Sequence, residues 1–142
     1  MDESVLIVGA GSGLSASLAR LCASKEMKVV LAARNIEKLE DLKKEIDAET
    51  YKCDSANIES VKNLFKGIDK TIGTPNLVIY NPSARLKGSI TELDPKKTHE
   101  AINVTCFGAF LVAQEASRRM LERKSGSIFF TGATAGVKGF AN

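Results

Sequence analysis

Short apolar runs alternate along the chain with segments in which apolar and polar residues mix. The runs Val5–Val8, Lys28–Ala33 and Leu77–Tyr80 are aliphatic and rich in β-branched residues, which predicts strands that are buried on both faces. Two further runs, Thr50–Cys53 and Ser127–Thr131, predict a third and a fifth strand in chain order. The pattern therefore predicts five strands.

Between these runs the apolar residues recur at helical spacing. One helix is expected from Leu14 to Lys25, a second after Asn35, a third after Asp54-Ser55, and a long helical stretch from Asp94-Pro95 to about Arg123 that can divide near Asn103. Each of the first three helices has residues expected to face the core of the domain: Leu14, Leu18, Leu21 and Cys22 on the first; Ile36, Leu39, Leu42 and Ile46 on the second; and Val61, Leu64, Phe65, Ile68 and Ile72 on the third.

Strand and helix alternate five times, so we expect an α/β fold with a parallel sheet covered on both faces. Right-handed crossovers and a glycine turn after the first strand predict a Rossmann-like, doubly wound sheet of strand order 3-2-1-4-5. We interpret residues 1–142 as one dinucleotide-binding domain that ends soon after strand 5, with the C-terminal strands of the fold missing.

Composition excludes several classes of protein. With 44% hydrophobic and 26% charged residues, the 142-residue chain has the balance of a globular domain. Its net charge of +3 is spread thinly, so we expect no nucleic-acid partner, and no apolar run approaches the ~20 residues of a membrane span. Three cysteines without a CxxC pair, with one histidine, indicate neither a disulfide framework nor a metal site. The first strand begins too near Met1 for a signal peptide, so we expect a cytoplasmic protein.

Three glycines on alternate positions, Gly9-x-Gly11-x-Gly13, follow the first strand and open the first helix. Glycines let the backbone approach a pyrophosphate, and the free N–H groups of the first helical turn attract it. We expect Gly9, Gly11, Ser12, Gly13 and Leu14 to bind a dinucleotide; the alternative is a tight turn without a ligand. An FAD enzyme is disfavoured, because flavin folds place the third glycine one position later and an acid after strand 2.

The second strand ends in Ala33-Arg34-Asn35, without the carboxylate that usually binds the ribose 2′-hydroxyl of NAD. A guanidinium can hold a 2′-phosphate with two hydrogen bonds, whereas an acid would repel it. We therefore expect NADP as the cofactor, with NAD less favoured. The alternative is that Arg34 is a solvated residue at a helix start.

Together with these motifs, Cys53-Asp54 after strand 3, Asn81 after strand 4 and Ile102-Asn103-Val104 before a long helix resemble the short-chain dehydrogenase/reductases over nearly the whole chain. The resemblance implies that Asp54 contacts the adenine amino group, that Ser55 lines the adenine pocket and that Asn81 lies beside the cofactor. It also implies that Asn103 is catalytic. Alternatively, Asp54 only caps the next helix and Asn103 is an ordinary polar residue inside a helix.

The same resemblance implies an oxidoreductase that transfers hydride between NADP(H) and a small carbonyl or alcohol substrate. It implies a homodimer or homotetramer formed through the long helix before strand 5. Enzymes of this family complete the reaction with a Tyr-x-x-x-Lys pair, which residues 1–142 lack, so we expect this chain alone to be inactive.

The chain departs from the family at three places. Ser15 stands where the last glycine of the first motif is expected, and Tyr80-Asn81-Pro82-Ser83 replaces Asn-Asn-Ala-Gly. Ala133 falls at the position of the catalytic serine, which Thr131 or Thr134 could replace only after a shift of one or two residues. These departures leave a second hypothesis open, a non-catalytic NAD(P)-binding sensor or structural protein.

Overall fold

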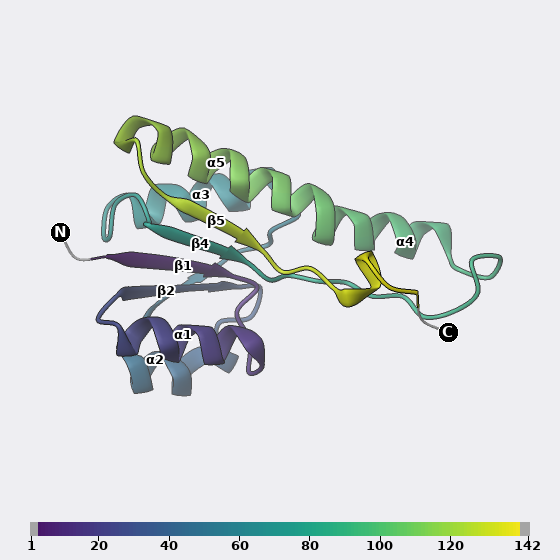
Figure 1. Cartoon of the computed structure of the whole chain (residues 1–142), viewed down its shortest axis with the longest axis horizontal. Helices are drawn as coiled ribbons and strands as arrows, with labels where there is room; N and C mark the ends of the chain where they lie inside the picture. The colour runs from purple at the N-terminus through teal and green to yellow at the C-terminus, as the bar shows by residue number, and fades with distance from the viewer. Residues whose placement is uncertain (1–2, 140–142) are drawn as a thin grey trace.

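The computed structural model describes residues 3–139 and has a five-stranded parallel sheet at its centre (Figure 1). Its strands are β1 (Ser4–Val8), β2 (Lys28–Ala33), β3 (Glu49–Lys52), β4 (Leu77–Tyr80) and β5 (Ser127–Phe130). They lie in the order β3-β2-β1-β4-β5, and every neighbouring pair is parallel. This arrangement confirms the predicted doubly wound sheet, whose direction of growth reverses between β1 and β4.

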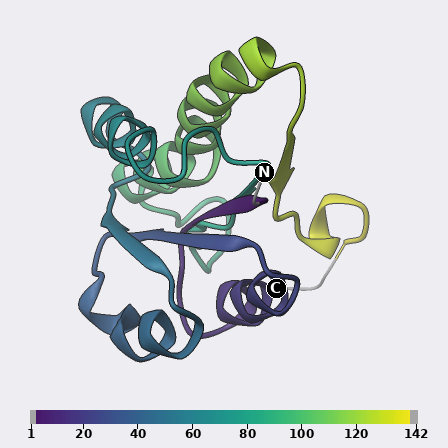
Figure 2. The same cartoon turned by 90° about the vertical axis from the view of Figure 1, so that its left-hand side faces the viewer.

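Helices cover both faces of the sheet. Figure 2 shows α1 (Leu14–Ser24, purple) and α2 (Glu40–Ile46, blue) on one side, and α3 (Ile58–Ile68, teal) and α5 (Gly108–Arg123, green) on the other. A short 3₁₀ turn (Glu37–Leu39) leads into α2, and α4 (Pro95–Ile102) extends the line of α5. Two apolar layers follow from this arrangement, one on each face of the sheet.

Alternate residues of β1 enter the two layers. Leu6 and Val8 belong to the cluster shared with α3 and α5, while Val5 and Ile7 belong to the cluster shared with α1 and α2. All four side chains are buried, as expected for a central strand of a parallel sheet. Phe65 on α3 has the largest fully buried side chain among the described residues, and the predicted burial of Val61, Leu64 and Ile68 is confirmed with it. Ile72, the fifth residue expected to face the core, lies after the end of α3 and is half-buried.

The prediction for the inner face of α1 was wrong in part. Leu14 and Leu21 are 52% and 55% exposed, whereas the buried residues of this helix are Ser15, Ala16, Ala19 and Cys22. Small side chains turn toward the sheet and allow the helix to pack close to it. Leu14 and Leu21 lie on a neighbouring, exposed stripe of the helix, and Leu18 between them is half-buried and packs against the edge of the core.

Two predicted helix starts have different outcomes. Asp94 caps α4 through a 2.8 Å hydrogen bond from the Lys97 backbone N–H, and Pro95 is the first helical residue, as predicted. The cap of α3 is Asn57, whose side-chain oxygen accepts the Ser60 N–H at 2.8 Å. The alternative that Asp54 caps this helix is therefore wrong.

The long helical stretch is divided at Asn103, as expected, by a π-helical turn (Asn103–Phe107) between α4 and α5. Within this stretch, Ile102, Phe107 and Phe110 are exposed, and the two phenylalanine rings stack with centroids 6.2 Å apart. Packing of this helix against a second subunit stays a prediction. Within residues 3–139, no helix is both long and apolar enough to cross a membrane.

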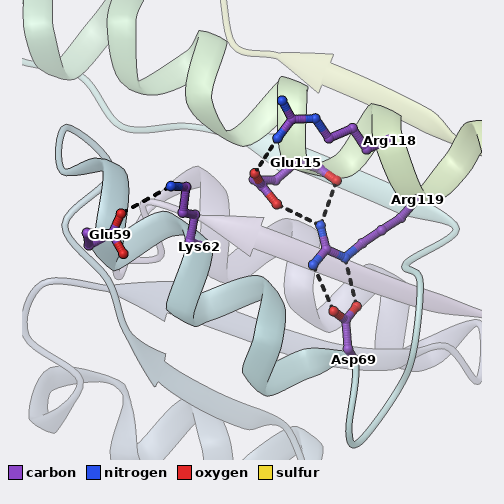
Figure 3. Close-up of polar contacts among 6 residues, drawn as sticks. All are labelled: Glu59, Lys62, Asp69, Glu115, Arg118 and Arg119. Carbon is purple, nitrogen blue, oxygen red and sulfur yellow. Dashed lines mark hydrogen bonds and ion pairs between the residues drawn. The ribbon is translucent and has the colours of Figure 1, made fainter.

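A group of ion pairs joins α3 to α5 (Figure 3). The Arg119 guanidinium donates two hydrogen bonds, of 2.8 and 2.7 Å, to the carboxylate of Asp69, and a third of 2.8 Å to Glu115. It also lies 5.0 Å from the centre of the buried Phe65 ring. Arg118 contacts only the outer side of Glu115 and is 61% exposed, against 19% for Arg119.

Arg119→Ala is expected to lower the free energy of unfolding by about 2 kcal/mol, because charge-assisted hydrogen bonds to a half-exposed carboxylate and a cation–π contact are lost together. Arg118→Ala is the matched control and should change it by less than about 0.5 kcal/mol. Urea unfolding followed by circular dichroism measures both. Equal effects of the two substitutions would contradict the assignment of Arg119 as the link between the helices.

Candidate cofactor site

A cavity of about 560 Å³ opens at the carboxyl ends of the strands. It is lined by the loops that follow β1, β2, β3 and β4, together with Val104 from the π turn. In an open parallel sheet, ligands bind at this edge, where the strand order reverses. Its volume lies within the range of small-molecule pockets.

The three glycines of the turn after β1 have different surroundings. Gly9 has a φ of +79°, donates its N–H to the Ala32 carbonyl at 2.9 Å, and has no room for a Cβ, which would lie 2.5 Å from the Pro82 nitrogen. A Cβ on Gly11 or Gly13 would meet nothing within 4 Å. Gly9 is therefore required by the turn itself, whereas the other two leave open space next to it.

The amino end of α1 completes this side of the site. Gly13 is the N-cap residue and has no side chain that could accept a hydrogen bond from the first helical turn. Gly11 and the exposed Ser12 line the cavity, while Gly13 and Leu14 lie outside its lining. An anion in the cavity would lie near the partial positive charge of the helix terminus.

Ser15 has a role that the sequence did not reveal. Its hydroxyl donates to the Gly9 carbonyl at 3.1 Å and accepts from the Asn81 side-chain amide at 2.7 Å. Ser15 is buried, so these bonds fix the end of β4 to the glycine turn. The serine that replaces the expected glycine thus orients Asn81, which lines the cavity.

Positive side chains gather where β2 ends. Arg34 and Lys38 are exposed and line the cavity, and Arg34 also lines an adjoining hollow of about 430 Å³ with Lys52 and Asp54. Lys38 was missed in the sequence, although its position four residues after Arg34 was a usable signal. Across the cavity and the adjoining hollow, three cations (Arg34, Lys38 and Lys52) outnumber one carboxylate (Asp54), so the charge here is positive.

The loop after β3 supplies Asp54 and Ser55 to the lining. The Asp54 backbone N–H donates to Ser60 Oγ at 2.9 Å, and its carboxylate accepts the Ala56 N–H at 3.1 Å. These bonds hold the loop in a tight turn with the Asp54 side chain exposed at the cavity. Ser55 is buried behind it.

Asn103 stands at the start of the π turn, where its carbonyl accepts the Gly108 N–H. Its side chain is half-buried, and its neighbour Val104, rather than Asn103, lines the cavity. Thr131, Ala133 and Thr134 are exposed residues after β5, and none of residues 131–139 lines the cavity. The catalytic role of Asn103 stays a prediction.

The chain matches a known family over its length. A family profile described as short chain dehydrogenase matches residues 3–142. An uncharacterized oxidoreductase of Staphylococcus aureus (strain USA300) is 32% identical over 140 residues, which cover 96% of this chain and 61% of the relative. Human 3-oxoacyl-[acyl-carrier-protein] reductase is 24% identical over 141 residues, 98% of this chain and 60% of that protein.

Solved structures show the same fold. A variant of actinorhodin polyketide ketoreductase with NADPH has a TM-score of 0.93 at 25% identity, over 98% of this chain and 56% of that one. A short-chain dehydrogenase from Rhodopseudomonas palustris has a TM-score of 0.89 at 28% identity, over 99% and 68%. The chain spans about 60% of the length of the curated relatives it matches. Its family profile, fold and strand-end cavity agree, and the chain belongs to the short-chain dehydrogenase family.

Proposed function

We propose that this chain binds NADP(H) in the cavity at the strand ends, as the cofactor-binding part of an oxidoreductase that acts on a small carbonyl or alcohol. The observation that carries the proposal is the pairing, in one cavity, of an open glycine turn with the exposed cations Arg34 and Lys38. A dinucleotide phosphorylated on its adenosine ribose presents negative charge at two separate places, and these two features suit both.

The residues fit such a ligand. Gly11 and Ser12 would hold the pyrophosphate beside the amino end of α1, where the space next to the glycines is open. Asp54 and Ser55 would lie against the adenine, and Asn81, held by Ser15, against the far ribose. When bound, the nicotinamide supplies or accepts the hydride.

The preference for NADP over NAD rests on charge. No carboxylate follows β2 directly, and Arg34 and Lys38 both line the cavity from the segment that follows β2. A 2′-phosphate would form charge-assisted hydrogen bonds there, whereas a 2′-hydroxyl would leave both cations without a strong partner. The ketoreductase with NADPH has the same fold over this region, which supports the proposal without deciding it.

Asn103 is proposed to act at the reacting end of the site. The π turn places its neighbour Val104 in the lining, and π-helical turns are frequent at functional sites. The proposed substrate class is taken from the family, whose enzymes transfer hydride between a nicotinamide cofactor and a carbonyl or alcohol carbon.

Titration calorimetry tests cofactor binding directly. The chain should bind NADPH at least about tenfold more tightly than NADH, since one charge-assisted hydrogen bond contributes about 1.5–3 kcal/mol. Raising the salt concentration should narrow the difference, because the cations are exposed. Absence of binding would refute the proposal, and equal affinities would refute its NADP specificity.

A further inference from the structure

Tyr80, the last residue of β4, connects three segments behind the cavity wall. Its side chain is 3% exposed, and its hydroxyl hydrogen-bonds to the carbonyl of Val104 in the π turn and to Ser55 Oγ at 3.1 Å. A phenol carries one proton and a carbonyl only accepts, so Tyr80 donates to Val104 and the Ser55 hydroxyl donates to Tyr80.

Gly108 packs at the same point. A Cβ on Gly108 would overlap the Tyr80 hydroxyl and lie 2.7 Å from the Ser55 carbonyl oxygen. Gly108 also closes the π turn, because its N–H donates to the Asn103 carbonyl. The turn that carries Asn103 is therefore pressed directly against Tyr80 and the backbone of Ser55.

The contact joins two parts of the cavity. Ser55 lines the part assigned above to the adenine, and Val104 lines the wall next to Asn103. The hydrogen bonds run from Ser55 through Tyr80, both of which are buried, to the half-buried Val104. Burial raises the pKa of the Tyr80 hydroxyl, which therefore keeps the proton that it donates.

We propose that Tyr80 is a positioning residue: its hydroxyl fixes the π turn relative to Ser55, so that occupation of the adenosine half of the site sets the position of Asn103. This inference rests on the proposed function, because it takes the Ser55 side of the cavity as the adenosine half. It extends that function to a residue that replaces the first asparagine of the family motif. Phenylalanine at this position would fill nearly the same volume and remove only the hydroxyl.

The experiment uses 2′,5′-ADP, the adenosine half of NADP without nicotinamide, and nuclear magnetic resonance of the ¹⁵N-labelled chain. In the wild type, 2′,5′-ADP should change the chemical shifts of the Asn103 side-chain amide and the Gly108 backbone amide. In Tyr80→Phe those two shifts should fall by more than about half, while calorimetry shows binding within about threefold of the wild type. Tyr51→Phe is the matched control and should keep both shifts, because the Tyr51 hydroxyl contacts Glu49 on β3 and Thr71 after α3, neither of which lines the cavity.

A second measurement needs no ligand. Hydrogen exchange of the Gly108 amide should be at least about tenfold faster in Tyr80→Phe, and faster to a smaller degree in Ser55→Ala, with α1 amides unchanged. Exchange of Gly108 unchanged in both variants, or ligand shifts equal in the wild type and Tyr80→Phe, overturns the inference. If 2′,5′-ADP does not bind, the proposed function and the coupling both fail, while the exchange result separately decides whether Tyr80 holds the π turn.

Discussion

Replacing Arg34 with aspartate is expected to weaken NADPH binding by about 100-fold and to change NADH binding by less than about threefold. The guanidinium is exposed at the cavity and would hold the 2′-phosphate with two charge-assisted hydrogen bonds. Aspartate removes those bonds and adds repulsion of the phosphate, while it can accept a hydrogen bond from the 2′-hydroxyl of NADH. The preference for NADPH should therefore reverse.

Calorimetry with both cofactors on the wild type and Arg34→Asp measures this change. Lys44→Asp is the control, because it alters the net charge equally from an exposed position on α2 that does not line the cavity. It should leave both affinities within about twofold of the wild type. If Lys44→Asp weakened NADPH binding as strongly, the effect would come from overall charge and not from a contact at Arg34.

Gly9→Ala is expected to lower the free energy of unfolding by about 3 kcal/mol. The φ of +79° disfavours an L side chain, and the added Cβ would lie 2.5 Å from the nitrogen of Pro82, a backbone atom that cannot rotate away. Separation of β1 from the loop after β4 would then also disturb the Ser15 contacts to Gly9 and Asn81.

Gly11→Ala is the matched control, because a Cβ there meets nothing within 4 Å. Its free energy of unfolding should change by less than about 1 kcal/mol, while NADPH affinity falls because the methyl group enters the space assigned to the pyrophosphate. Urea unfolding and calorimetry separate the two effects. A Gly9→Ala variant as stable as the wild type would show that the turn can rearrange around Pro82.

The sheet could be predicted because the residues that determine each strand are neighbours in the sequence. The apolar runs and the glycine turn set the strands and, with the crossover rule, their order, which the structure confirms. The inner face of α1 could not be predicted in the same way. Spacing identifies two neighbouring apolar stripes on this helix, one with Leu14 and Leu21 and one with Ala16 and Ala19. The alanine stripe packs on the sheet. Which stripe does so depends on how closely the helix approaches the sheet, and helical spacing alone does not show this.

The site divides along similar lines. Residues that lie within two positions of a strand's end, such as Gly9, Arg34 and Asp54, could be placed in advance, because the carboxyl ends of parallel strands meet at one edge. The partners of Ser15 and Tyr80 lie 66 and 24 residues away along the chain, at Asn81 and Val104, so no local pattern reveals them. The one sequence signal that set both residues apart was their departure from a motif.

The exposed cations at the end of β2 also set the distance over which the chain distinguishes its ligands. With a net charge of only +3, the molecule as a whole exerts a weak field. Arg34 and Lys38 are exposed, so at physiological ionic strength their charges are screened beyond about 8 Å. Discrimination between NADPH and NADH would therefore arise after the ligand has entered the cavity. It would appear in the dissociation rate more than in the association rate.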